Sequence, residues 1–171
     1  MRKRAAAVVA LLMVLPLADV RPGAAAGDDT CARQSLHAWL PDRLAEARLS
    51  FSGLLKNGRT RVGQHFASGA LRELRVIVSW RDTEHAHMQR LDLYSPDGSL
   101  YQRFTTAFTG RRFPVAVVTR VPVAGSSIVD SGLYGAWCAE VFLDDDDAPI
   151  VRHRFDLTAP GAPGPASPSR R

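Results

Sequence analysis

The residues best suited to chemistry lie between positions 84 and 88, in the order Glu84-His85-Ala86-His87-Met88. Residues two apart in an extended segment project to the same side, so His85 and His87 would face one way. Imidazole with a nearby thioether is a ligand set that suits copper, and imidazole also suits zinc. His85, His87 and Met88 therefore form a candidate metal site. A solvated loop in which Met88 starts the next strand explains the same residues.

Four successive acids, Asp144 to Asp147, form a second cluster with possible chemistry. Hard cations such as calcium take several oxygen ligands, but adjacent carboxylates in an extended turn point apart. The EF-hand spacing is also missing from the sequence. Acid/base catalysis needs carboxyl groups in separate environments, and these four share one. The pattern favours a solvated hairpin tip.

Motifs of the common enzyme classes are missing from the sequence. It contains no Gly-x-Ser-x-Gly, P-loop, dinucleotide-binding glycine pattern, Cys-x-x-Cys or His-Glu-x-x-His. Ser126 and Ser127 follow Gly125 within a stretch rich in glycine and serine, which is typical of a loop. We therefore expect a protein that is not an enzyme, with no catalytic residues and no cofactor.

The first 26 residues resemble a secretory signal peptide. A basic start, Arg2-Lys3-Arg4, precedes an apolar run from Ala5 to Leu17 and the small residues Ala24-Ala25-Ala26. The apolar run falls short of the roughly 20 residues that span a bilayer, although an uncleaved anchor is the alternative. We expect cleavage near Ala26/Gly27, a periplasmic or secreted product, and no transmembrane segment after cleavage.

The charge of the chain is concentrated in this leader. The chain has 22 Lys and Arg against 17 Asp and Glu, and without residues 1–26 the balance is 18 against 16. A nearly neutral mature chain gives no argument for binding nucleic acid or an anionic membrane. We therefore expect an unidentified protein or envelope ligand as the partner, and no nucleic acid.

Two cysteines, Cys31 and Cys138, remain in the mature chain. In an oxidising compartment an even pair predicts a disulfide, which would tie the N-terminal segment to the strand that carries Trp137. The alternative is two unpaired, buried thiols.

Alternating apolar residues predict strands over 47–54, 71–80, 113–123, 133–143 and 151–157, and a hairpin over 88–108. Ser95-Pro96-Asp97-Gly98 supplies the turn of that hairpin. Residues 56–59, 68–69 and 124–132 are predicted to be turns and loops, and residues 64–68 place Phe66 as an isolated apolar anchor. About seven strands and little helix indicate an all-β, Greek-key sandwich of the immunoglobulin-like type. The predicted core residues are Trp80, Leu91, Leu93, Phe104, Trp137, Val141 and Phe155.

These elements divide the chain into four parts. Residues 1–26 are the signal peptide, 27–46 a polar lead segment, 47–158 the β-sandwich domain and 159–171 a tail rich in proline and glycine. Such a tail has almost nothing to bury, so we expect it to be disordered.

The order of these motifs resembles that of the poorly characterised bacterial secreted domains with an immunoglobulin-like sandwich. The resemblance rests on the strand before Trp80, the Pro96-Asp97-Gly98 hairpin, Gly135-Ala136-Trp137 and the closing Phe155-Asp156-Leu157. It covers about residues 47–158 and implies a fold, but no functional residues.

Two functions remain open from the sequence. The first is a non-catalytic secreted or periplasmic module that acts by binding or by supporting an envelope assembly. The alternative is a periplasmic copper- or zinc-binding protein that uses the segment from Glu84 to Met88.

Overall fold

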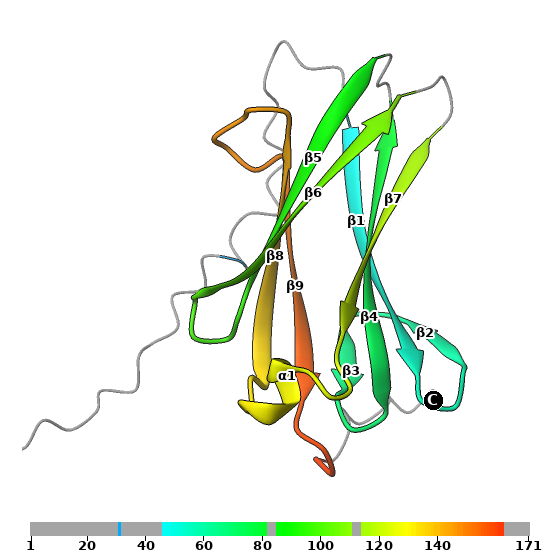
Figure 1. Cartoon of the computed structure of the whole chain (residues 1–171), viewed down its shortest axis with the longest axis vertical. Helices are drawn as coiled ribbons and strands as arrows, with labels where there is room; N and C mark the ends of the chain where they lie inside the picture. Colours follow the sequence, from blue (N-terminus) through cyan, green and yellow to red (C-terminus); the bar gives the residue numbers. More distant parts are fainter. Residues whose placement is uncertain (1–30, 32–45, 82–84, 111–113, 163–171) are drawn as a thin grey trace, which may run out of the picture.

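The computed structural model describes residue 31 and residues 46–81, 85–110 and 114–162. The predicted signal peptide, most of the lead segment, Glu84 and the tail beyond residue 162 lie outside the described residues. In the described part, strands dominate (Figure 1). They are β1 (Glu46–Leu55), β2 (Thr60–Val62), β3 (His65–Ala67), β4 (Leu71–Arg81), β5 (Ala86–Tyr94), β6 (Leu100–Thr109), β7 (Val115–Pro122), β8 (Gly135–Leu143) and β9 (Val151–Thr158), with one short helix, α1 (Ser127–Asp130).

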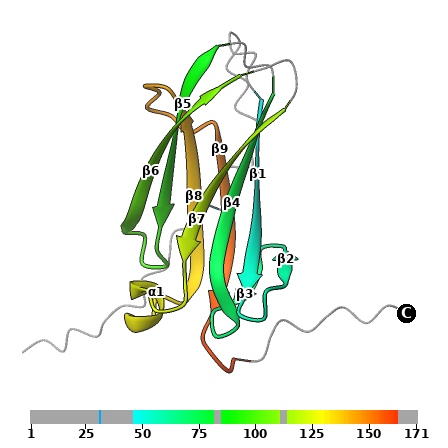
Figure 2. The same ribbon diagram turned by 45° about the vertical axis from the view of Figure 1, so that its right-hand side comes forward.

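The strands form two sheets, in the orders β2-β1-β4-β7 and β3-β9-β8-β5-β6. All pairs are antiparallel except β3 with β9. The sheets lie face to face as two layers (Figures 1 and 2). The strands β1, β4 and β7 correspond to A, B and E of an immunoglobulin domain, and β5, β8 and β9 to C, F and G. The predicted fold class, an all-β immunoglobulin-like sandwich, is therefore confirmed.

The two-residue period of the sequence produces the buried layer between the sheets. In β4, Leu74, Val76, Val78 and Trp80 are buried while the residues between them are half-buried. The closing hairpin of β8 and β9 supplies further buried residues on the opposite sheet. Of the residues predicted for the core, all are buried except Phe104, which is half-buried and packs against the core because its strand β6 is at an edge of its sheet.

Both core tryptophans satisfy their indole N–H groups inside the protein. Trp80 Nε1 donates to Oε1 of the buried Gln89 at 2.8 Å, and Trp137 Nε1 donates to the Leu133 carbonyl at 3.0 Å. The Trp137 ring stacks on Phe155 with 5.9 Å between centroids. Because an unpaired buried N–H is costly, these bonds let two large aromatic rings fill the core.

Three short elements were not predicted from the sequence. The strands β2 and β3 lie between the predicted turns at 56–59 and 68–69, and α1 lies within the predicted loop 124–132, with Ile128 buried, so the loop prediction was wrong there. Elements of three or four residues are too short to display a period. Phe66 on β3 is buried, and a Cβ on Gly53 would lie 2.9 Å from Phe66 Cδ1, so only glycine allows this close approach.

Within the described residues, the structure contains no helix with the length and apolar character needed to cross a membrane.

Candidate functional site

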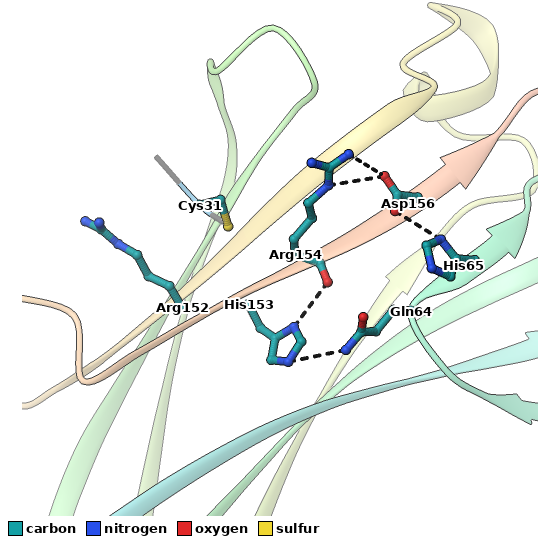
Figure 3. A pocket seen from close by; sticks show the side chains of 7 residues that line it. All are labelled: Cys31, Gln64, His65, Arg152, His153, Arg154 and Asp156. Carbon is teal, nitrogen blue, oxygen red and sulfur yellow. Dashed lines mark hydrogen bonds and ion pairs between the residues drawn. The ribbon is translucent and has the colours of Figure 1, made fainter. Parts of the chain in front are cut away.

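A hollow of about 390 Å³ lies where β9 meets the short strand β3 (Figure 3). It is the candidate site because it gathers titratable and hydrogen-bonding side chains. The lining residues are Cys31, Gln64, His65, Arg152, His153, Arg154 and Asp156. Figure 3 shows Cys31 between the two arginines, with His153 directed toward Gln64.

The strand β9 supplies most of this lining through its alternation. Phe155 and Leu157 are buried on the inner face, whereas Arg152, Arg154 and Asp156 alternate with them and project to the outer face. The parallel strand β3 then places His65 beside Asp156, because these two residues are register partners. The backbone N–H of Asp156 also donates to the Gln64 carbonyl at 2.7 Å, which fixes Gln64 at the mouth.

Asp156 joins the two strands of the site through its side chain. Its Oδ1 accepts from Arg154 Nη2 at 3.2 Å, and its Oδ2 lies 3.0 Å from His65 Nδ1. The Asp156 side chain is about a quarter exposed, at 23%, while the two cationic partners are about half-exposed. Exposed ion pairs contribute little to stability, so this arrangement is better suited to orienting side chains than to holding the fold.

His153 is held in one orientation by three contacts. Its ring makes an edge contact with Phe51, with 5.7 Å between centroids. Its Nδ1 lies 3.2 Å from the Arg154 carbonyl, and its Nε2 lies 3.3 Å from Gln64 Nε2. Since an amide nitrogen can only donate, Nε2 accepts and Nδ1 carries the proton in the neutral ring. The structure thus places His153 at the core edge with hydrogen bonds.

The predicted disulfide is confirmed: Cys31 is bonded to Cys138, with 5.8 Å between their Cα atoms. Cys138 lies on β8 directly opposite Arg154 on β9. The bridge therefore fixes Cys31 at the margin of the hollow. A stable disulfide is characteristic of oxidising compartments, which points to an extracytoplasmic location.

The lining favours hydrogen-bond donation. Two guanidinium groups, two imidazoles and a carboxamide face one carboxylate. His65 and Asp156 form a histidine–carboxylate pair of the kind that activates nucleophiles, but the described lining offers it neither a hydroxyl nor a free thiol. Across the described residues, no group of three or more His, Cys, Asp or Glu side chains is arranged to hold a metal ion.

The structure does not bring His85, His87 and Met88 together as one ligand set. His87 and Met88 are neighbours on β5, so their side chains leave opposite faces, and Met88 is 42% exposed. The imidazole of His87 instead lies 2.9 Å from Asp144 Oδ2 and packs near the Phe108 ring. His85 is exposed just before the strand.

The acidic turn is largely exposed, as the sequence interpretation has it, and Asp144 in addition ties it to β5. Asp144 Oδ1 accepts the Met88 backbone N–H at 2.9 Å, and the Asp144 N–H donates to the Met88 carbonyl at 2.7 Å. Asp144 adopts a left-handed backbone, with φ of 53°. Aspartate tolerates that region better than most residues because its short side chain bonds locally.

The sequence analysis missed most of the hollow. It gave no role to Gln64, His65, Arg152, Arg154 or Asp156, because β3 is too short to be recognised and its pairing with β9 spans about ninety residues of sequence. One signal was present, since Arg152, Arg154 and Asp156 alternate in phase and so had to share one face of the closing strand.

Comparison with known proteins gives little beyond the fold. No family model matches the chain, and no curated protein matches it. Among solved structures it is similar to an immunoglobulin-like protein from Pseudomonas aeruginosa, at 12% identity and a TM-score of 0.38, covering 66% of this chain and 97% of that one. That protein belongs to the group which the sequence resembles. The fold assignment itself comes from the strand order described above.

Proposed function

We propose that the protein is a non-catalytic, extracytoplasmic module that binds a carboxylate- or phosphate-bearing ligand in the hollow between β3 and β9. The observation that carries the proposal is the composition of the lining, in which Arg154, His65 and His153 accompany one acid, Asp156, while Arg152 pairs with Glu140 outside the lining. Guanidinium groups match planar or tetrahedral oxyanions geometrically, which is why arginine is enriched where such groups are bound.

Preorganisation supports this reading. His153 is oriented by Phe51 and Gln64, and Asp156 orients His65 and Arg154, so several donors are held before a ligand arrives. A ligand then loses less free energy to side-chain ordering. The hollow lies on β9, which pairs with β8 along most of its length and with β3 at its end, and sites on such rigid elements are more exact than sites on loops.

A binding role is favoured over catalysis for two reasons. The His65–Asp156 pair has no hydroxyl or free thiol to activate within the described lining. The hollow is also open to solvent, so it does not exclude water in the way that electrostatic catalysis requires.

The test is a titration of the isotope-labelled protein with inorganic phosphate and with acetate, at constant ionic strength kept with sodium chloride. We expect saturable changes in the NMR signals of Gln64, His65 and residues 152–156, in response to one of the two anions. Whichever anion saturates identifies the ligand group as phosphate or carboxylate.

Matched arginine variants make the titration specific. Arg154→Gln should weaken the saturable response at least severalfold, whereas Arg120→Gln, an exposed arginine on β7, should leave it unchanged. Changes that grow linearly with both anions, or that are equal in both variants, would overturn the proposal.

A further inference from the structure

Among the described residues the two sheets have four edge strands, of which β6 is the longest and contains no proline. The edges are β2 and β7 in one sheet and β3 and β6 in the other. The strands β2 and β3 have three residues each, and β7 ends on Pro122. Short length and proline are the usual means by which proteins protect a sheet edge.

The strand β6 runs for ten residues without a proline and with Arg103 as its single charged residue. Threonine and aromatic residues, which favour strands, make up six of its ten residues. Most of its residues are exposed, including Leu100 at 46%. In the described part of the chain β6 pairs only with β5, and Figure 2 shows it at the outer margin of its sheet. Its outer edge is thus built as a template for another strand.

The one charged side chain of β6 is held against its own sheet. Arg103 Nε and Nη2 donate to the two carboxylate oxygens of Asp92 at 2.7 and 2.8 Å. Asp92 is buried, and this contact raises the pKa of Arg103 above its ordinary value. Arg90 lies 3.7 Å from the same carboxylate, so the two arginines share it. Pairing with a copy of the chain therefore requires that the two Arg103 side chains stay apart.

We propose that two copies of this chain pair through their β6 strands, antiparallel, with Thr105 on the two-fold axis. In an antiparallel pair, directly opposed residues share a face, so this register sets Arg103 opposite Ala107 and Phe104 opposite Thr106. It pairs the strand from Tyr101 to Thr109 and extends two five-stranded sheets into one continuous sheet.

Charge separation and pairing length together select this register, because Thr106 on the axis would pair only residues 103–109 of β6. With Thr105 on the axis, the two Arg103 side chains lie four residues apart along the strands, or roughly 13 Å, beyond the screening length of about 8 Å at physiological salt. With Phe104 on the axis they would lie two residues apart, roughly 7 Å along the strand, and would repel. Because the pairing uses the same edge of both copies, the assembly closes as a dimer and leaves the β6 edge of neither copy exposed.

The test uses sedimentation velocity on the purified protein with its disulfide intact. We expect a dimer whose dissociation constant rises about tenfold or more in Thr105→Lys, since two lysines would then face each other on the axis. Thr105→Glu should weaken the dimer in the same way. An equal mixture of the two variants should restore it.

A lysine elsewhere on an exposed strand controls for surface charge and folding. Val118 on β7 is 47% exposed, and Val118→Lys should sediment like the wild type. The proposal is overturned by a wild type that stays monomeric into the submillimolar range, by a Thr105→Lys protein that dimerises as tightly as the wild type, or by a mixture that does not recover the dimer.

Discussion

Trp137 is the side chain through which the closing hairpin holds the rest of the core. It is buried, stacks on Phe155 and meets the edge of the Tyr101 ring at 5.1 Å between centroids. Trp137→Ala should destabilise the fold by about 3 to 5 kcal/mol, because the cavity would lie among residues of both sheets. Urea unfolding followed by circular dichroism measures this.

The contribution of the Trp137 indole N–H to stability can be measured separately from that of the ring. Trp137→Phe retains an aromatic ring but loses the bond to the Leu133 carbonyl, so it should cost less than the alanine variant. A loss below about 1 kcal/mol for Trp137→Ala would mean that the ring is not a core residue.

Through Asp97, in the turn between β5 and β6, the free energy of unfolding depends on pH. The Ser95 hydroxyl, which donates to Oδ1 at 2.6 Å, and the Ser99 backbone N–H lower the pKa of Asp97 from its ordinary value of 3.8. A lowered folded-state pKa adds stability above the unfolded-state pKa, and that stability is lost as pH falls through the folded-state value.

A carboxyl NMR titration measures this effect directly. The Asp97 midpoint should lie below 3.8 in the wild type and move up toward it in Ser95→Ala, which removes the strongest donor. The unfolding free energy of the wild type relative to Asp97→Asn should decrease as the pH falls into that range. Equal Asp97 midpoints in the wild type and Ser95→Ala would contradict the assigned cause.

At the scale of elements, Asp144 connects the β8–β9 hairpin to the start of β5. Its carboxylate contacts His87 Nδ1 and the Met88 N–H, and its backbone is left-handed. Asp144→Ala removes the carboxylate and keeps a Cβ in that region, whereas Asp144→Gly removes the Cβ as well. We expect the alanine variant to be less stable than the glycine variant by about 1 kcal/mol.

Hydrogen exchange at the Met88 amide gives a local readout of this connection. Exchange should be faster in both Asp144→Ala and Asp144→Gly, and nearer to the wild type in Asp144→Asn, which keeps an acceptor oxygen. Unchanged protection of Met88 in the alanine variant would show that the backbone pairing alone protects the amide.

The long strands could be predicted because they leave a local pattern in the sequence. The sites could not be predicted because their residues meet only in the folded structure. A strand such as β4 displays its period over eleven residues, and the turn at Pro96-Asp97-Gly98 has local backbone requirements. By contrast, the hollow depends on His65 and Asp156 meeting across a parallel pair. The contact of His87 with Asp144 likewise joins residues 57 apart. Neighbours that meet through tertiary structure leave no local pattern.

At the scale of the whole molecule, the outer face of the five-stranded sheet balances its own charges. Asp92 on β5 pairs with Arg103 on β6, and Glu140 on β8 lies 2.6 Å from Arg152 Nε on β9. Burial raises the pKa of Tyr94 between these strands, and the carboxylates of Glu140 and Asp92 raise it further. This pairing is in keeping with the near-neutral charge of the chain beyond residue 26, and Arg152 belongs both to it and to the lining of the hollow.

The disulfide stabilises the fold by joining Cys31, near the N-terminal side of the chain, to Cys138 on β8. Cys31 and Cys138 close a loop with a sequence separation of 107, so on the chain-entropy model the bridge stabilises the fold by about 4 to 5 kcal/mol. Neither cysteine belongs to the buried core cluster, which is built from residues between Phe51 and Leu157. Reduction should therefore lower the unfolding midpoint while the β-sheet circular dichroism spectrum at room temperature stays largely unchanged.

The double variant Cys31→Ser/Cys138→Ser separates loss of the bridge from effects of the reductant. It should unfold at the same midpoint as the reduced wild type, and reductant should not shift it further. Non-reducing mass spectrometry of the native protein should yield one cross-linked peptide containing both cysteines. Two thiols open to alkylation would refute the bridge. Loss of the β-sheet spectrum on reduction would mean instead that the hydrophobic core is not sufficient to keep the sandwich folded without the disulfide.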